Sequence, residues 1–275
     1  MGNSSKENRL NELSPQEWLP FTKTWFIHNP AKRSSKEVLH PAKYPEDLVE
    51  KFICFFTKTG EVVFDPFLGT GSTVIAAERV GRKGIGIELQ KKYVDITKER
   101  LKSEHLKSEP ITSGLIIQGD SQKINSLWKK HHLPEIGLVI TSPPYGPMLN
   151  KTGLISRDRT EKGLDVNYSD DPEDLGNALT YDIFLQKLTN IFLNLKPKVK
   201  EGGHIVVILQ NYMHKGEYKM LAWDFAREMS KHFQFRGEKI WCQDNKTLYP
   251  YGYRYSFVPN VHHHYCLIFK KIKST

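Results

Sequence analysis

The stretch EVVFDPFLGTGST, residues 61–73, decides the fold of this chain. Its first four residues are mostly apolar and β-branched, which predicts a buried strand. Two glycines follow, and the apolar-rich run at 74–80 predicts a helix. Glycines between a strand and a helix let the backbone approach a ligand closely, and Ser72 or Thr73 can cap the helix whose amides face that ligand. The stretch therefore predicts a ligand-binding loop at the carboxyl end of a strand.

Three further predicted strands also end in polar groups. They are GIGIE at 84–88, LIIQGD at 115–120, and IGLVI at 136–140, which runs into TSPPY at 141–145. An amphipathic helix is predicted between the first two of these strands, at 90–104. Strands that alternate with helices indicate a mainly parallel sheet with right-handed crossovers. The four strand ends are then expected on one edge, which is where open α/β sheets bind ligands.

The TSPPY stretch has an unusual backbone. Neither Pro143 nor Pro144 has an N–H for a strand ladder, and each keeps the residue before it out of the helical region. The result is a stiff, extended corner that holds the Ser142 hydroxyl and the Tyr145 ring. Taken alone, the corner is either a ligand-binding element or a Pro-Pro turn with a surface tyrosine. The partner groups on the other strand ends favour the first interpretation.

The remaining parts of the chain are less distinctive. Residues 1–15 are polar and are expected to be frayed. The next aromatic residues, expected to dock on the core or to stack on bases, are Trp18, Phe21, Trp25 and Phe26. Further predicted elements are a helix from Pro45 to Gly60, a helix from Pro172 to Leu195, a strand at 204–209, a helix at 218–233 and a closing hairpin at 240–271.

Composition narrows the class of protein. A chain of 275 residues with 39% hydrophobic residues can bury one sizeable core with a small appendage. Lys and Arg outnumber Asp and Glu by 40 to 31, and the net charge of +9 favours a polyanionic partner. The three scattered cysteines, at 54, 242 and 266, lack metal-ligand spacing and fit a reducing compartment. No apolar run reaches membrane-spanning length, and a cytoplasmic location without membrane contact is expected.

Taken in order, these motifs resemble those of the S-adenosylmethionine-dependent DNA amino-methyltransferases, which methylate exocyclic nitrogens of adenine or cytosine. DPFLGTGST at 65–73 resembles the family's cofactor loop, and HPAKYP at 40–45 resembles the segment that folds over the methionine moiety. TSPPY at 141–145 resembles the catalytic motif. The resemblance is close over 25–145 and weaker in the strands near the C-terminus. One such motif is weak evidence, whereas the ordered set is strong.

The resemblance implies an α/β, Rossmann-like class I methyltransferase domain. Its mostly parallel seven-stranded sheet would have helices on both faces and a C-terminal antiparallel hairpin. This single domain would span 25–275, after an N-terminal extension at 1–24. Glu88 is expected at the ribose of the cofactor and Asp120 at its adenine amino group. The residues implied in cofactor binding are His40, Pro41, Ala42, Lys43, Asp65, Pro66, Phe67, Gly69, Gly71, Ser72, Thr73, Glu88 and Asp120.

The resemblance also implies a catalytic set without a metal, formed by Ser142, Pro143, Pro144 and Tyr145. An exocyclic amino nitrogen is a poor nucleophile because its lone pair is delocalised into the ring. Ser142 Oγ and the Pro143 carbonyl are expected to accept its two hydrogens, and Tyr145 to stack on a base flipped out of double-stranded DNA. In the resembled family Ser before Pro-Pro usually accompanies cytosine N4, and Asp or Asn accompanies adenine N6. Ser142 therefore points to cytosine N4 in a short target sequence, as in restriction–modification enzymes.

No motif identifies the element that reads the target sequence. The segment at 146–176 is a candidate recognition insert, and another subunit is a further possibility. Its basic part, 146–164, is either a mobile loop that orders on DNA or a solvated loop of mixed charge, whereas the acids between 165 and 174 make phosphate contact improbable there. The loop that carries Tyr249, Tyr251, Tyr253 and Tyr255 is expected either to grip DNA or wall the base pocket, or to pack at a sheet edge. His262, His263 and His264 lack cysteine and acidic partners, so strand histidines rather than metal ligands are expected.

Two rival classes of function remain. Within the enzyme class, the same site could serve adenine N6 or an amino group of RNA. Outside it, the chain could be a nucleic-acid-binding protein with a vestigial cofactor pocket. Cofactor binding and the identity of the methylated nucleoside separate these hypotheses.

Overall fold

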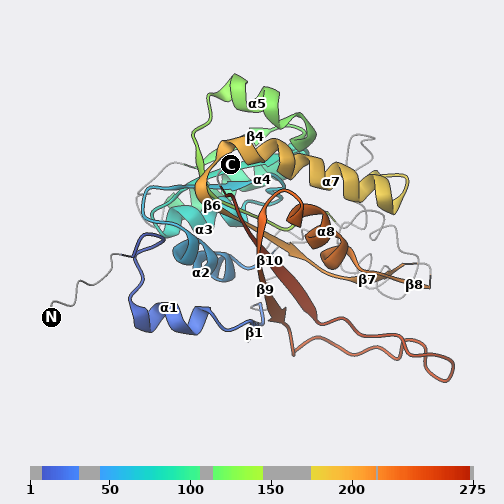
Figure 1. The fold of residues 1–275 in the computed structure, drawn as a ribbon. Coiled ribbons are helices and arrows are strands. Elements are labelled where there is room, and N and C mark those ends of the chain that lie inside the picture. The colour runs from blue at the N-terminus through green and yellow to red at the C-terminus, as the bar shows by residue number, and fades with distance from the viewer. Residues whose placement is uncertain (1–7, 31–43, 106–113, 145–174, 215, 273–275) are drawn as a thin grey trace.

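The structure, a computed structural model, describes residues 8–30, 44–105, 114–144, 175–214 and 216–272. In this part of the chain eight strands form one sheet in the order β1-β9-β10-β6-β5-β2-β3-β4 (Figure 1). β10 is antiparallel to both of its neighbours, and all other neighbouring pairs are parallel. The strands are β1 (Trp25–Ile27), β2 (Val62–Asp65), β3 (Lys83–Glu88), β4 (Leu115–Gln118), β5 (Ile136–Thr141), β6 (Val199–Leu209), β9 (Gln234–Cys242) and β10 (His263–Lys270). A separate hairpin pairs β7 (Tyr212–His214) with β8 (Glu217–Lys219).

Helices cover both faces of the sheet (Figure 1). One face carries α1 (Pro15–Phe21), α2 (Glu46–Phe56) and α3 (Ser72–Arg79), with α4 (Lys91–His105) beside β3 and β4. The other face carries α5 (Ile124–His131), α7 (Tyr181–Leu195) and α8 (Leu221–Ser230). Among the described helices, none combines the length and the apolar character needed to cross a bilayer.

The apolar run at 205–209 shows why β6 lies in the middle of the sheet. Ile205 and Val207 pack in the core under α7 and α8, whereas Val206 and Ile208 pack in the core under α2. All four side chains are at most 1% exposed. A strand buried on both faces is continuously apolar rather than alternating. Each such side chain contributes about 1.5–3 kcal/mol of burial free energy.

The seven predicted strands are present, and β1 adds an eighth. Residues Trp25–Ile27 pair in parallel with Ile240–Cys242, so that β1 covers the outer edge of β9. An uncovered edge would leave unpaired backbone groups. β6 and β9 begin earlier than predicted, at Val199 and Gln234. The closing antiparallel pair formed by β9 and β10 is confirmed.

The prediction that the chain is frayed up to residue 15 is wrong for residues 8–14. Asn11 is 1% exposed, and its Nδ2 donates to the Phe55 carbonyl at 2.6 Å. A buried side-chain amide needs such a partner, and finding one fixes the segment to α2. The predicted docking of aromatic residues on the core is confirmed for Trp18 and Phe21, whose rings lie 4.6 and 4.1 Å from the ring of Phe55. Trp25 is instead 48% exposed.

Two helix boundaries also differ from the prediction. α7 begins at Tyr181, where the Thr180 side chain accepts a hydrogen bond from a backbone amide as N-cap. The predicted start, Pro172, lies outside the described residues. α8 begins at Leu221, because Tyr218 belongs to β8. The spacing of apolar residues at 218–233 suits a helix, so it did not indicate the short hairpin that β8 forms with β7.

Candidate active site

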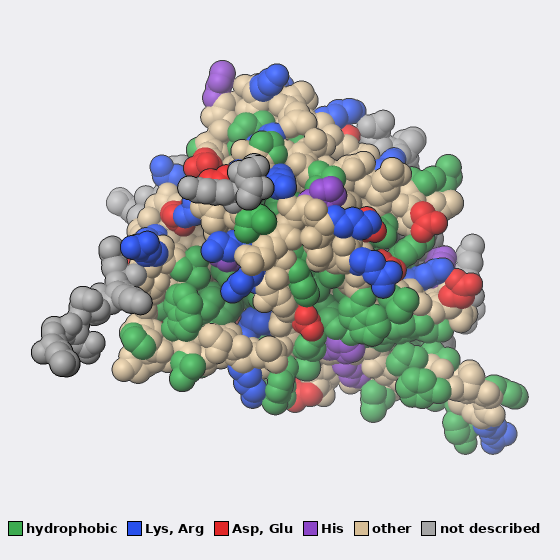
Figure 2. All heavy atoms as spheres, in the orientation of Figure 1, with side chains coloured by type: hydrophobic (Ala, Val, Ile, Leu, Met, Phe, Trp, Pro, Cys, Tyr) green, Lys and Arg blue, Asp and Glu red, His purple; other side chains and the backbone are tan. Residues whose placement is uncertain are grey.

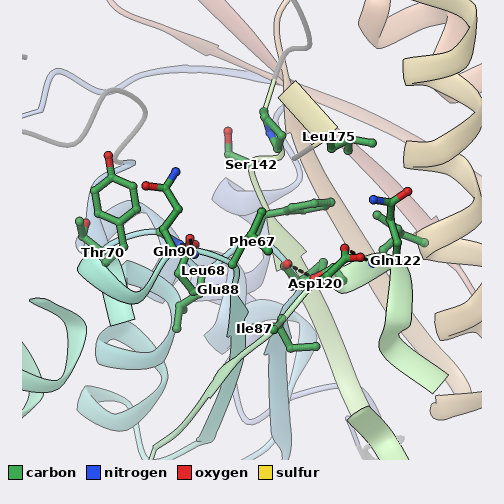
Figure 3. A pocket seen from close by; sticks show the side chains of 18 of the residues that line it. Phe67, Leu68, Thr70, Ile87, Glu88, Gln90, Asp120, Gln122, Ser142 and Leu175 are labelled. Carbon is green, nitrogen blue, oxygen red and sulfur yellow. Dashed lines mark hydrogen bonds between the residues drawn. The ribbon is translucent and has the colours of Figure 1, made fainter. Parts of the chain in front are cut away.

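A hollow opens at the carboxyl edge of the sheet, where β2, β3, β4 and β5 end (Figure 3). It encloses about 820 Å³ when space open to solvent is counted. The predicted site residues that line it are Pro66, Phe67, Gly69, Ser72, Glu88, Asp120, Ser142 and Pro144. His40, Pro41, Ala42, Lys43 and Tyr145 lie outside the described residues, as does most of the segment 146–176. Four loops that are distant in sequence thus form one cavity.

The loop after β2 requires its glycines. Gly69 and Gly71 have φ values of +56° and +89°, a region that side chains other than glycine rarely adopt. A Cβ on Gly71 would lie 2.3 Å from Thr97 Cγ2 of α4. Gly71 is also the N-cap of α3, so the prediction that Ser72 or Thr73 caps this helix is wrong. Both hydroxyls bond elsewhere, Ser72 Oγ to Glu46 at 3.1 Å and Thr73 Oγ1 to Asp65.

Asp65, at the end of β2, is fully buried and does not line the hollow. Its carboxylate accepts hydrogen bonds from Tyr44 Oη at 2.7 Å, Thr141 Oγ1 at 2.6 Å, the Phe67 amide at 2.9 Å and the Thr73 hydroxyl. Burial raises the pKa of the Asp65 carboxyl, and the four hydrogen bonds oppose that rise. The donors come from the segment before α2, from the loop, from α3 and from β5. Asp65 is therefore a positioning residue that joins four segments of the site.

Glu88, at the end of β3, faces the hollow and is 9% exposed. Its Oε2 accepts a hydrogen bond from the Gly69 amide at 2.8 Å, and its Oε1 accepts one from the Gln90 amide at 2.8 Å. Hydrogen bonds to a carboxylate are about twice as strong as neutral ones. Glu88 therefore fixes the glycine loop against β3 while it presents a negative charge to the hollow.

Asp120, after β4, is the second acid of the hollow. Its Oδ1 accepts a hydrogen bond from the Gln122 amide at 2.8 Å and so caps the short 3-10 helix Ser121–Lys123. Ser121 Oγ donates to the Pro66 carbonyl, which ties this loop to the loop after β2. The Phe67 ring lies between Asp120 and Ser142 (Figure 3).

The corner after β5 completes the cavity. Ser142 and Pro144 line the hollow, whereas Pro143 is buried. β5 lies directly beside β2, with Phe64 opposite Val139. This pairing brings the Ser142 hydroxyl to the same hollow as the acids of β3 and β4. The sequence predicted this convergence from the rule that parallel strand ends share an edge.

Three supporting residues were missed by the sequence analysis. Tyr44 lines the hollow and donates to Asp65, and Thr141 bonds the same carboxylate. Arg100 of α4 donates to the Thr70 carbonyl and to Glu46 of α2, and so braces the loop from outside. The first two lie inside the HPAKYP and TSPPY motifs, which is the signal that could have identified them. Arg100 lies in no recognised motif, and its hydrogen bonds to Thr70 and Glu46 depend on how α4 packs against the loop and α2.

His263 and His264 pack against aromatic rings in the structure. His264 stacks on Trp241 with ring centroids 4.7 Å apart, and burial lowers its pKa to about 3. His263 Nε2 lies 3.1 Å from Tyr265 Oη. Within the described ranges, no group of three or more His, Cys, Asp or Glu side chains is arranged to hold a metal ion.

The fold and the hollow together define a class of protein. The glycine turn follows β2, and the acids Glu88 and Asp120 follow β3 and β4 on a Rossmann-like sheet, an arrangement found in nucleoside-binding folds. A solved structure of a proposed rRNA methylase from Clostridium thermocellum shares this fold, with a TM-score of 0.50 and 14% sequence identity. The likeness covers 84% of this chain and 99% of that one. The fold is that of the class I methyltransferases.

Sequence comparison shows which proteins the chain is similar to. Residues 2–99 match the family model of the N6/N4 DNA methylases. Similar proteins include the orphan methyltransferase M.BamHII of Bacillus amyloliquefaciens, 43% identical over 36% of this chain, and the type II methyltransferase M2.DpnII of Streptococcus pneumoniae, 44% identical over 24%. The matched segments span only 36% and 25% of those relatives. Over residues 2–99 the chain is therefore similar to the N6/N4 DNA methylases.

Proposed function

We propose that this chain transfers a methyl group from S-adenosylmethionine to N4 of cytosine in a short sequence of double-stranded DNA. The observation that carries the proposal is that Ser142 lines the same hollow as Glu88 and Asp120. An acceptor for an amino group and two acids suited to a nucleoside thus lie in one cavity. The similarity to type II methyltransferases supports DNA as the substrate and a role in restriction–modification, and we expect the enzyme to act in the cytoplasm.

The lining of the hollow fits the proposed cofactor. Glu88 and Asp120 supply carboxylates for ribose hydroxyls and an adenine amino group, and Phe67, Ile87 and Leu89 supply apolar walls for a flat base. The glycine loop lets the backbone approach the ligand closely. When bound, S-adenosylmethionine supplies the activated methyl group. The protein's own part is to hold the acceptor nitrogen in line with that group, which lowers the entropic cost of the reaction.

The catalytic corner supplies acceptors for the target amino group. Ser142 Oγ and the Pro143 carbonyl would accept its two hydrogens, which favours a tetrahedral nitrogen whose lone pair points at the methyl group. The base must leave the helical stack to reach the hollow. Ser142 in place of Asp or Asn favours cytosine N4 over adenine N6. The hydrogen bond from Thr141 to Asp65 holds this corner beside the cofactor loop.

The test is methyl transfer followed by nucleoside analysis. The purified chain is incubated with radiolabelled S-adenosylmethionine and either DNA or RNA, and the labelled nucleoside is identified by chromatography. We expect N4-methylcytosine in DNA, loss of product with Ser142→Ala, and full activity with Ser126→Ala, a change at an exposed serine of α5. N6-methyladenine as the only product would overturn the choice of base. Label in RNA alone would overturn the choice of substrate.

A further inference from the structure

The loop between β9 and β10, residues 243–262, projects from the body of the protein (Figure 1). We call it the aromatic finger. It leaves from the carboxyl end of β9, on the edge of the sheet where β5 delivers Ser142. β9 is three strands away from β5 in the sheet, a separation of about 14 Å at ~4.8 Å per strand. The finger and the catalytic corner therefore face the same side of the molecule.

The finger exposes large apolar side chains. Tyr253 is 69% exposed, Tyr255 93%, Phe257 90% and Leu248 72%. Apolar side chains gather along this projection in the space-filling view as well (Figure 2). The alternative from the sequence, tyrosine packing at a sheet edge, does not describe Tyr253 and Tyr255. Contiguous exposed apolar groups on a folded protein mark an interaction site.

Hydrogen bonds between its two arms give the finger a defined shape. Asn260 accepts from the Tyr249 amide and donates to the Tyr249 carbonyl, both at 2.9 Å. Gln210, just after β6, donates to the His263 carbonyl at 2.8 Å and holds the base of the finger. At the tip, the Ser256 amide donates to the Gly252 carbonyl at 2.9 Å. The tip is therefore presented outward in advance of binding, which lowers the entropic cost of association.

The charge of the finger points to an anionic partner. The finger carries Lys246 and Arg254 and a single acid, Asp244, which lies at its base and accepts a hydrogen bond from Asn29 Nδ2 at 2.6 Å. Arg254 lies at the exposed tip between Tyr253 and Tyr255. Aromatic rings combined with cations are the pattern used to hold nucleic acids.

We infer that the aromatic finger docks on the DNA duplex to one side of the target base, with its rings against sugars and base edges and Arg254 at a phosphate. The inference rests on the proposed function, because it takes DNA as the substrate. An arm of ten residues, from Gln243 to Gly252, spans at most about 33 Å, close to one turn of B-DNA. The finger therefore contacts DNA within about one turn of the target, on one flank only.

The test combines finger variants with shortened duplexes. Affinity is measured by fluorescence anisotropy for a duplex with 12 base pairs on each side of the target and for duplexes cut back on either side. We expect the wild-type protein to lose about tenfold or more in affinity when one particular flank is removed. The double variant Tyr255→Ala/Phe257→Ala should show the same loss on the full duplex and no further loss on the shortened one. Leu19→Ala, an exposed apolar residue on α1, is the matched control and should behave like wild type.

A salt titration distinguishes the proposed phosphate contact of Arg254 from the proposed contacts of the aromatic rings. Arg254→Ala should reduce the slope of log Kd against log salt by about one, whereas the aromatic variant should leave the slope unchanged. Binding of S-adenosylmethionine by calorimetry should be unaffected in all finger variants, because no residue of the finger lines the hollow.

Three results would overturn the inference. The first is a double variant with wild-type affinity and wild-type sensitivity to flank length. The second is a wild-type dimer in sedimentation without DNA that the double variant abolishes, because the tip would then hold a second copy of the chain. The third is a wild-type protein that binds the cofactor but no duplex, which would overturn the proposed function as well.

Discussion

Thr141 Oγ1 donates a hydrogen bond to Asp65 Oδ1 at 2.6 Å, across 76 residues of sequence. Thr141 immediately precedes Ser142, and Asp65 begins the loop that leads to Gly69. Both side chains are fully buried at the ends of two neighbouring parallel strands, β5 and β2. The contact therefore fixes the corner formed by Ser142, Pro143 and Pro144 relative to the loop after β2.

Replacing Thr141 by valine tests this contact. Thr141→Val keeps the shape of the side chain but removes one of four donors to a buried carboxylate, so we expect the free energy of unfolding to fall by about 1–3 kcal/mol. The rate of methyl transfer should fall as well, because the corner loses its hold on the cofactor loop. Urea unfolding and single-turnover transfer measure the two effects. Thr141→Ser keeps the hydroxyl, so its stability and its rate of methyl transfer should be close to those of the wild type. A Thr141→Val variant that transfers methyl groups at the wild-type rate would show that the contact does not position the corner.

Alanine substitutions at two glycines with similar backbone angles distinguish the cost of backbone strain from the cost of a steric clash. Gly60 and Gly71 have φ values of +80° and +89°, but a Cβ on Gly60 would meet nothing within 4 Å. Gly60→Ala should therefore cost only the ~1–2 kcal/mol of a left-handed alanine. Gly71→Ala should cost more and should weaken cofactor binding, because its Cβ would lie 2.3 Å from Thr97 Cγ2.

The clash at Gly71 can be relieved from the other side. Thr97→Ser removes the Cγ2 atom, so adding it to Gly71→Ala should recover part of the lost stability in urea unfolding. Equal costs for the two alanine substitutions, with no recovery in the double variant, would contradict this view of the loop.

The sequence predicted the central sheet well because its signals there are local. Buried parallel strands such as 136–140 are continuous apolar runs, and the glycine turn at 69–71 has few alternatives to a strand–helix connection. β1 could not be predicted, because three residues pair with β9 only through contacts that are distant in sequence. The order of residues 8–14 was missed for the same reason, since it depends on the Asn11 bond to Phe55.

The candidate site was predicted as a set of strand ends, and the structure places those ends together. What the sequence could not show is which polar groups face the hollow. Asp65, predicted to bind the cofactor, is buried below the loop, and Gly71 takes the capping position predicted for its neighbours. These distinctions depend on side-chain direction, which strand and turn patterns do not encode.

Glu88 should control cofactor affinity. Glu88→Ala removes the acceptor of the Gly69 and Gln90 amides and the charge proposed to bind the ribose. Each hydrogen bond to a charged group contributes ~1.5–3 kcal/mol, so we expect affinity for S-adenosylmethionine to fall by about tenfold to a hundredfold or more. Isothermal titration calorimetry measures it. Glu99→Ala, at an exposed position on α4, is the control, and unchanged affinity in Glu88→Ala would remove the ribose assignment.

His204 should make the fold sensitive to acid. Burial, aided by the charges of Lys270, Arg236 and Lys200, lowers its pKa from 6.5 to about 4. Between these pH values the unfolded chain binds a proton that the folded chain does not. The contribution of His204 to the free energy of unfolding should therefore be constant above pH 6.5 and fall by up to about 3 kcal/mol as the pH drops towards 4.

The variant His204→Gln tests this titration. Urea unfolding at several pH values should show that the free energy of unfolding falls less with decreasing pH in His204→Gln than in the wild type. Part of the fall should remain, because the pKa of His264 is also lowered, to about 3. His232→Gln changes an exposed histidine and should leave the decline unchanged. If the free energy of unfolding of His204→Gln fell with pH as much as that of the wild type, groups other than His204 would cause the acid sensitivity.

The central claim is that Ser142 and the acids of the hollow form a site for methylating cytosine N4 in DNA. Its most direct test is methylation-sensitive sequencing of DNA from cells that express the chain, compared with cells that express Ser142→Ala. We predict N4-methylcytosine at one short sequence, present with the wild-type chain and absent with the variant. N6-methyladenine at a specific sequence, or unmodified DNA from cells that contain folded, cofactor-binding protein, would contradict the claim.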